Sequence, residues 1–106
     1  LYLDDCVDAL VHTINRINAV QSEVLNVGSG EGYSLVHLAE LIADRIDTDI
    51  GVTVDDSRTG EVDRFVANID RSRRLLGFDP AFSLPAGLDQ TVLWYLDRPE
   101  LLSDIP

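Results

Sequence analysis

The sequence predicts an α/β fold with about four helices and two or three short strands. Apolar residues recur at helical spacing in several segments, and short β-branched runs lie between these segments. Glycine, serine, aspartate or proline marks most of the expected boundaries. The 106 residues are enough for one small domain, 1–106, with a modest hydrophobic core.

The first expected helix begins near Asp4 or Asp5, either of which can cap it. Its apolar face carries Cys6, Leu10, Val11, Ile14 and Ile17. We expect the Cys6 thiol to be buried and inert on this face. Residues 23–27 (EVLNV) form the first expected strand.

The central part of the chain repeats the pattern of turn, helix and strand. Ser34 is the expected N-cap of a second helix, whose apolar positions are Leu35, Leu38, Ala39, Ile42 and Ile46. Residues 50–54 (IGVTV) form a second expected strand, and Arg64–Ala67 a short third one.

Two further helices are expected in the last third of the chain. Asp70 caps a short helix that ends at Gly77 in the left-handed conformation. Ser83 caps the last helix, which continues to about Arg98 because Pro99 stands just beyond it. The remaining tail is expected to be frayed.

The charge of the chain is unusually negative. It holds 19 acidic residues and 8 arginines, no lysine, and a net charge of −11. This charge argues against nucleic acid and anionic membrane as direct partners. Aspartate excess without lysine is typical of adaptation to a saline cytoplasm, and an ordinary acidic protein is the alternative.

Apolar runs are short, so the sequence predicts neither a transmembrane helix nor a signal peptide, and we expect a cytoplasmic location. A single cysteine excludes an internal disulfide and a multi-cysteine zinc site. The chain starts at Leu1 and contains no methionine, which indicates a piece of a longer protein.

The stretch NVGSGEGYS raises the question of a cofactor loop. Together with the acidic pair Asp55–Asp56, it resembles a dinucleotide-binding βαβ unit. However, the third glycine stands one position early at Gly32, and Tyr33 occupies the place that the fingerprint reserves for glycine. Ser34 starts the helix beyond the loop, and Glu31 would repel a pyrophosphate. We therefore interpret the loop as a turn that needs positive φ at one or more glycines.

Four segments together are similar to one known family. They are YLDDCVDAL, EVLNVGSGEGYSLVHLAELIA, RTGEVDRFVANIDRSRRLLGFDP and SLPAGLDQTVLWY. In order and spacing they resemble the C-terminal portion of the NAD-dependent epimerase/dehydratase family, the extended short-chain dehydrogenases/reductases. The resemblance covers nearly the whole chain.

The resemblance implies the C-terminal substrate-binding lobe of such an enzyme, without its cofactor-binding half. NAD or NADP would be bound by the N-terminal Rossmann portion, and the glycine turn would lie beneath the sugar-nucleotide site. The family's catalytic Tyr-x-x-x-Lys pair cannot lie in a chain without lysine. We therefore expect no catalytic, cofactor or metal residue here, and no activity of the fragment alone.

The candidate site is the stretch Arg58-Thr-Gly60-Glu61. The family pattern implies that Arg58 binds the diphosphate of a nucleotide-diphosphate sugar and that Glu61 accepts from the ribose hydroxyls. A guanidinium fork matches phosphate oxygens, and Gly60 allows a turn between the two side chains. The alternative is a surface arginine paired with nearby carboxylates.

The remaining polar and aromatic candidates have structural explanations. The pairs Asp4–Asp5 and Asp55–Asp56 suit capping and solvation better than acid–base work. Two isolated histidines, a basic cluster and an aromatic pair suit ion pairing and packing better than ligand binding. They are His12 and His37, then Arg71, Arg73 and Arg74, and then Trp94 and Tyr95, the last two as the core and rim of the final helix.

The function that follows is the nucleotide-sugar-binding portion of an NAD(P)-dependent epimerase or dehydratase. The alternative is a free-standing interaction or ligand-binding module derived from such an enzyme.

We expect the stability of the fold to rise with salt. With a net charge of −11, self-repulsion is strongest at low ionic strength and is screened as salt is added. The melting temperature measured from about 0.05 to about 2 M KCl tests this, since the screening length falls to ~3 Å at 1 M salt. A flat or falling curve would remove the argument for saline adaptation.

Overall fold

The computed structural model describes residues 1–46, 51–56 and 64–102. The chain divides into two compact units. Unit 1 comprises Leu1–Gly32 and Val62–Leu84, and unit 2 comprises Tyr33–Glu61 and Pro85–Pro106.

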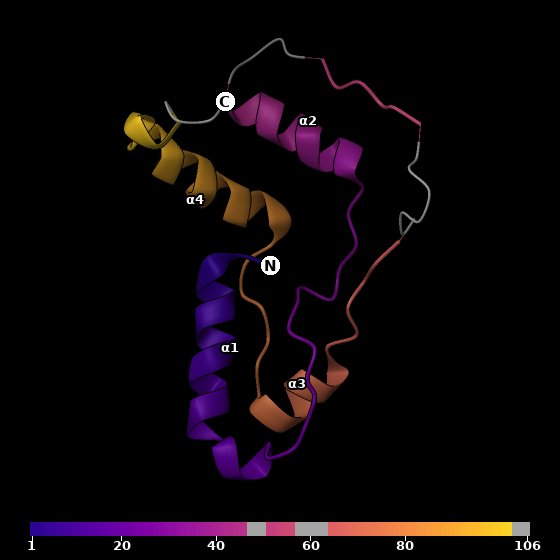
Figure 1. The fold of residues 1–106 in the computed structure, drawn as a ribbon, viewed down its shortest axis with the longest axis vertical. Helices are drawn as coiled ribbons and strands as arrows, with labels where there is room; N and C mark the ends of the chain where they lie inside the picture. The colour runs from indigo at the N-terminus through magenta and orange to yellow at the C-terminus, as the bar shows by residue number, and fades with distance from the viewer. Residues whose placement is uncertain (47–50, 57–63, 103–106) are drawn as a thin grey trace. The chain divides into compact units, whose positions relative to one another are not determined.

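Four α-helices and two short 3₁₀ helices make up the regular structure of the described ranges (Figure 1). Unit 1 holds α1 (Leu3–Asn15), η1 (Ile17–Ala19) and α3 (Asp70–Leu76), with α1 and α3 in contact. Unit 2 holds α2 (Leu35–Arg45), α4 (Leu84–Leu96) apart from its first residue, and η2 (Pro99–Leu102). The four helices lie where the sequence predicts them.

The predicted α/β class is wrong, because no described residue belongs to a strand. The three segments expected as strands are 23–27, 50–54 and Arg64–Ala67. They carry no regular structure, residue 50 lying outside the described ranges.

The reason is visible where residues 23–27 pass α3. A strand needs hydrogen bonds to the backbone of a second strand. Here the backbone carbonyls of residues 23–27 accept hydrogen bonds from side chains instead. Arg71 Nη1 donates to the Val24 carbonyl over 3.4 Å, and Ser72 Oγ donates to the Asn26 carbonyl. Asn26 Nδ2 in turn donates to the Asn68 carbonyl over 3.4 Å. In residues 23–27 the β-strand composition is therefore not matched by a ladder.

The start of α1 is organised differently from the prediction. Tyr2 is the N-cap residue without a side-chain cap, so neither aspartate caps the helix. Asp4 and Asp5 lie in the first turn, and Asp5 is buried. Its two carboxylate oxygens accept from the N–H groups of Ala81 and Phe82, over 2.8 and 3.1 Å. Asp5 thus ties α1 to the chain that follows α3.

The hydrophobic core lies in unit 1, between α1, α3 and the segments beside them. It consists of Ala9, Val20, Leu76 and Phe78, with Leu25 and Leu75 packed against it. One helical turn beyond Ala9, His12 Nδ1 donates to the Leu76 carbonyl over 2.9 Å. The face of α1 that packs is therefore the one with Asp5, Ala9 and His12.

The apolar face predicted for α1 points the other way, and the predicted burial of Cys6 is wrong. All five residues of that face, Cys6, Leu10, Val11, Ile14 and Ile17, are exposed. The cause is the set of specific polar contacts on the opposite face, which fixes the rotation of the helix about its axis.

The local signals at helix ends are confirmed in two cases. Ser34 Oγ accepts from the His37 N–H over 3.1 Å, and Gly77 ends α3 with φ 66° in the left-handed region. The predicted cap Asp70 is instead the first residue of α3, and Asn68 Oδ1 accepts from its N–H over 2.9 Å.

The last helix ends at Leu96, two residues before the expected end near Arg98. The tail expected to fray was residues 100–106, and its first three residues belong instead to η2 (Pro99–Leu102). Residues 103–106 lie outside the described ranges.

The glycine turn of unit 1 lies directly against residues 66–69. A Cβ atom on Gly28 would be 3.1 Å from Ala67 Cβ, and one on Gly32 would be 2.7 Å from Val66 Cγ2. Gly30 adopts φ +74°, and its Cβ would be 3.2 Å from Ile69 Cδ1. The turn therefore needs glycine for close packing and for one left-handed residue, as interpreted from the sequence.

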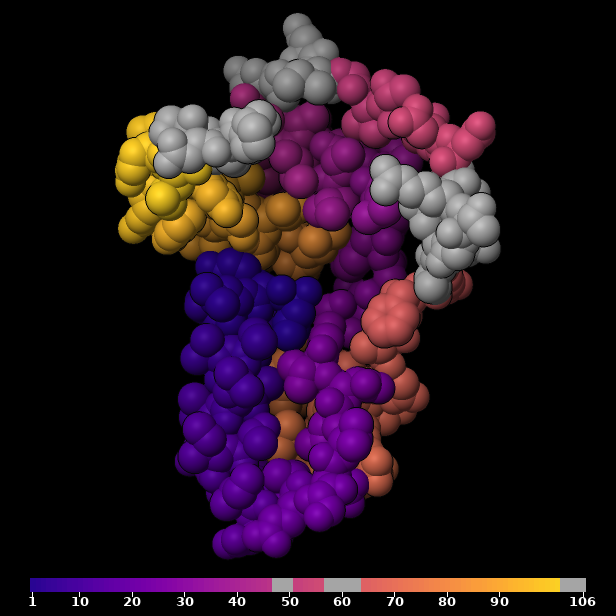
Figure 2. Space-filling model, in the orientation of Figure 1, coloured from indigo at the N-terminus to yellow at the C-terminus, as the bar shows by residue number. Residues whose placement is uncertain are grey.

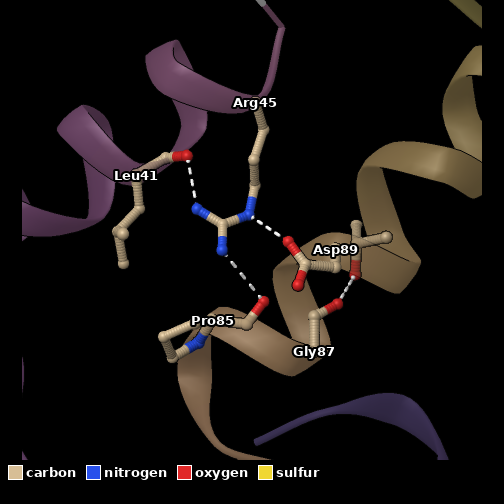
Figure 3. A network of polar contacts seen from close by, with 6 residues as sticks. Leu41, Arg45, Pro85, Gly87 and Asp89 are labelled. Carbon is tan, nitrogen blue, oxygen red and sulfur yellow. Dashed lines mark hydrogen bonds and ion pairs between the residues drawn. The ribbon is translucent and has the colours of Figure 1, made fainter.

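In unit 2, Arg45 joins α2 to α4 (Figure 3). Arg45 Nε donates to Asp89 Oδ1 over 2.6 Å, and its Nη1 and Nη2 donate to the carbonyls of Leu41 and Pro85. Little hydrophobic burial accompanies this contact, because none of the described hydrophobic side chains of unit 2 is buried.

We predict that Asp5→Asn destabilises the chain by about 1.5–3 kcal/mol, the usual loss for hydrogen bonds to a charged group. An amide keeps one acceptor and turns an NH₂ group towards the second backbone donor. Asp4→Asn, with the same charge change on the exposed neighbour, is the control and is expected to stay within about 0.5 kcal/mol of the parent. Urea unfolding measures both, and equal losses would contradict the role of Asp5.

We predict that Gly30→Ala destabilises the chain by about 1–2 kcal/mol, the cost of a left-handed L-residue, with crowding against Ile69 added. Gly51→Ala is the matched control, because nothing lies within 4 Å of its Cβ position and no positive φ is involved. Thermal melts of the two variants should differ clearly, and coincident melts would argue against the packing role of the turn.

Candidate functional site

The two residues predicted to bind substrate, Arg58 and Glu61, lie outside the described residues, as does Gly60 between them. The described neighbours along the chain are Asp56 on one side and Arg64 on the other, both exposed. Their binding role therefore stays a prediction.

The glycine turn, which the resemblance places beneath the sugar-nucleotide site, lies within the described residues. It packs on residues 66–69, which follow the Arg58–Glu61 stretch closely in the chain. The Ser29 hydroxyl accepts from the Glu31 N–H over 3.2 Å, a local contact that closes the turn on itself. Helix α2 starts at Leu35, beyond the turn, as Ser34 predicts. This geometry favours a structural turn over a pyrophosphate cradle.

The acidic pairs do not form a catalytic dyad in the described ranges. Asp5 uses both oxygens on backbone N–H groups, while Asp4 is exposed. Asp55 and Asp56 are both exposed as well. Structural and solvated roles therefore explain these carboxylates.

The two histidines lie on separate helices, and each has a carboxylate of its own helix within 4.0 Å. His12 Nε2 lies 3.5 Å from Asp8 Oδ2, and its Nδ1 is bonded to the Leu76 carbonyl. His37 Nδ1 lies 4.0 Å from Glu40 Oε2. Residues 1–46, 51–56 and 64–102 hold no group of three His, Cys, Asp or Glu side chains placed to bind a metal ion.

Ion pairs account for two arginines of the basic cluster. Arg71 lies 2.7 Å from Glu23, and Arg73 lies 2.7 Å from Asp79. Both pairs involve exposed arginines, which agrees with pairing on an acidic surface.

The aromatic pair near the end of α4 is exposed rather than core. Trp94 and Tyr95 form an edge-to-face contact with ring centroids 5.0 Å apart. The Arg98 guanidinium lies 4.6 Å from the centre of the Trp94 ring. The Trp94 ring therefore has a cation over its face, and the core role predicted within this core-and-rim pair is wrong, because both rings are exposed.

Sequence reasoning missed two structural anchors. Arg45 and Asp89 are 44 positions apart, and Asp5 and Ala81 are 76 apart. Periodicity and capping rules act over a few residues, so only the arrangement of the folded chain reveals these pairs. Along the described stretches, every helix is too short or too polar to cross a membrane.

Comparison with known proteins finds several curated relatives. The chain is 34% identical over 96 residues to dTDP-glucose 4,6-dehydratase of Streptomyces griseus, covering 90% of this chain and 29% of that one. It is 31% identical over 96 residues to GDP-L-fucose synthase 1 of Arabidopsis thaliana, covering 91% and 29%. It is 28% identical over 93 residues to the uncharacterized UDP-glucose epimerase YtcB of Bacillus subtilis, covering 88% and 29%.

The chain thus spans about three tenths of the length of the curated relatives it matches. No protein-family model and no solved structure matches it. The matches lie in the C-terminal portions of the relatives, as the quoted segments predict. The resemblance of this chain to the C-terminal portion of NAD-dependent epimerase/dehydratase family members is therefore confirmed.

Proposed function

We propose that this chain is the nucleotide-sugar-binding portion of a longer NAD(P)-dependent sugar-nucleotide epimerase or dehydratase that works in the cytoplasm. The observation that carries the proposal is the match of about nine tenths of the chain to the C-terminal portions of relatives. The names of these relatives refer to dTDP-glucose, UDP-glucose and GDP-L-fucose. A sugar joined to a nucleoside diphosphate is the chemistry that these names share.

In this proposal Arg58 binds the diphosphate and Glu61 the ribose. A guanidinium presents parallel N–H groups that match two phosphate oxygens and always carries its charge. A carboxylate accepts hydrogen bonds from two neighbouring hydroxyl groups. With a net charge of −11 the protein as a whole repels an anionic substrate. A positively charged arginine at the binding site would offset this repulsion locally.

The chain contributes no hydride chemistry of its own in this proposal. Its cations are eight arginines, and the lysine of the family's catalytic pair has no counterpart in it. NAD or NADP would therefore be held, and the sugar oxidised, by the N-terminal Rossmann portion. The packing of the glycine turn on residues 66–69 supports a structural role for the turn next to the binding stretch.

We predict that Arg58→Ala in the full-length protein weakens UDP binding about 10- to 100-fold, because a charge-assisted contact worth about 1.5–3 kcal/mol is lost. Arg58→Lys should recover only part of the affinity, since lysine keeps the charge without the fork. Arg64→Ala is the matched control, with the same charge change at an exposed described position. Calorimetry with UDP measures all three.

The role of Glu61 is tested by comparing UDP with dTDP. UDP carries a ribose with two neighbouring hydroxyls, and dTDP carries a deoxyribose with one. Glu61→Gln should therefore weaken UDP more than dTDP. If the folded fraction of the Arg58→Ala variant binds UDP as tightly as the parent does, whether or not the variant is destabilised, Arg58 is not a substrate residue.

A further inference from the structure

The negative charge of the chain is concentrated in unit 2, which comprises Tyr33–Glu61 and Pro85–Pro106. With histidine counted as neutral, this unit holds eleven acidic residues against three arginines, a net charge of −8. Unit 1 holds eight acidic residues against five arginines, a net charge of −3. The units are of similar length, and the self-repulsion of bodies of similar size grows with the square of the net charge. It is therefore about seven times larger in unit 2.

Hydrophobic burial, which opposes this repulsion, is also unequal between the units. Unit 1 buries the five hydrophobic side chains of Ala9, Val20, Ile69, Leu76 and Phe78. No described hydrophobic side chain of unit 2 is buried, and Leu93, Trp94 and Leu96 of α4 are between 46% and 58% exposed. In Figure 2 the last turns of α4 and η2 (yellow) lie at the surface. Because apolar burial is the main favourable term in folding, we expect unit 2 to be the less stable unit.

The contacts of Arg45 connect the two long helices of unit 2 (Figure 3). Arg45 is the last residue of α2, and its side chain is 18% exposed. On α4 its guanidinium donates to Asp89 Oδ1 over 2.6 Å and to the Pro85 carbonyl over 3.2 Å. On α2 it donates to the Leu41 carbonyl over 2.8 Å. One planar group thus satisfies acceptors on both helices at once.

The other described arginine of unit 2 makes its printed-sequence neighbours its partners. Arg98 Nη1 donates to the Trp94 carbonyl over 3.1 Å, and the guanidinium lies over the Trp94 ring. Both contacts stay within one turn of chain at the end of α4. Of the two arginines that the structure describes in unit 2, Arg45 is therefore the one that joins α2 to α4.

Salt acts differently on the repulsion and on the Arg45 contacts. The repulsion acts between largely exposed carboxylates, and the screening length falls from about 10 Å at 0.1 M salt to about 3 Å at 1 M. Two of the three acceptors of Arg45 are uncharged carbonyls, so screening weakens only its pair with Asp89, whose side chain is 55% exposed. Added salt therefore removes the interaction that opens unit 2 and leaves most of the contact that holds it closed.

We propose that unit 2 is a salt-dependent folding unit, which opens as a whole at low ionic strength while unit 1 stays folded, and that Arg45 is the side chain that holds it closed. Regions with few buried apolar contacts open separately from the rest of a protein, in contiguous cooperative units. The inference goes beyond the proposed function and is independent of the roles of Arg58 and Glu61.

Hydrogen–deuterium exchange with mass spectrometry tests the proposal in the 106-residue chain. At about 0.05 M KCl we expect the amides of α2 and α4 to be protected at least about tenfold less than those of α1 and α3. At about 2 M KCl this difference should shrink, because the repulsion is screened. Equal protection of all four helices at low salt, or an equal response of both units to salt, would overturn the proposal. Unprotected α1 and α3 would overturn it too, because unit 1 must stay folded.

Two aspartates of α4 and its end separate the role of Arg45 from that of net charge. Asp89→Asn and Asp97→Asn each remove one negative charge from unit 2, and Asp97 is exposed. Asp89→Asn should lower the protection of α2 and α4 together about two- to fivefold, because the ion pair with Arg45 is lost. Asp97→Asn should raise it slightly, because only repulsion is removed. If both variants raise the protection, net charge alone governs unit 2 and the role of Arg45 is wrong.

Arg45→Lys keeps the charge of unit 2 but loses the planar group that reaches three acceptors. It should lower the protection of α2 and α4 about tenfold and leave that of α1 and α3 unchanged. Arg98→Lys makes the same change on an arginine whose contacts stay near the end of α4, so it is the matched control and should leave α2 unchanged. An Arg45→Lys variant with unchanged α2 and α4, or with an equal fall in all four helices, would contradict the proposal.

Discussion

The contact between the Asp5 carboxylate and the backbone N–H groups of Ala81 and Phe82 sets the architecture of unit 1. A buried carboxylate is costly unless hydrogen bonds satisfy it, so this contact allows little freedom. It fixes which side of α1 faces inward, and Ala9 and His12 follow on that side at helical spacing. The apolar residues of α1 are turned outward as a consequence. The hydrogen bonds of Asp5 thus determine that the regular apolar face of α1 is exposed.

The glycine turn imposes the second constraint on the same unit. Its glycines let the backbone approach residues 66–69 more closely than a Cβ would permit at Gly32. The neighbouring segment 23–27 gives its carbonyls to side chains of α3, including Ser72. Side-chain hydrogen bonds and glycine packing therefore replace the ladder that the β-branched composition predicts. The turn has a structural explanation that needs no phosphate.

Prediction from the sequence succeeded where the signal is local. Ser34 as an N-cap and Gly77 as a left-handed helix end depend only on neighbouring residues, and both are confirmed. The strands and the inner face of α1 were predicted wrongly, because each depends on partners that lie 42 to 76 positions away. The candidate site could not be predicted from local sequence signals, for a different reason. The roles of Arg58 and Glu61 follow from resemblance alone, and no periodicity or spacing rule assigns them.

The mismatch between pattern and packing is itself informative. A sequence retains apolar residues at regular helical positions when folding or binding covers them, since exposure gives no stabilisation. In α1 the apolar residues, such as Leu10 and Ile14, lie on one face of the helix, whereas the buried residue Ala9 lies on the opposite face. Helix α4 shows a related mismatch within unit 2, where Leu93, Trp94 and Leu96 are exposed although most of the helix is apolar. A helix that is apolar on most of its sides belongs to an interior. The described residues of the two units therefore contain more hydrophobic pattern than the contacts within each unit use.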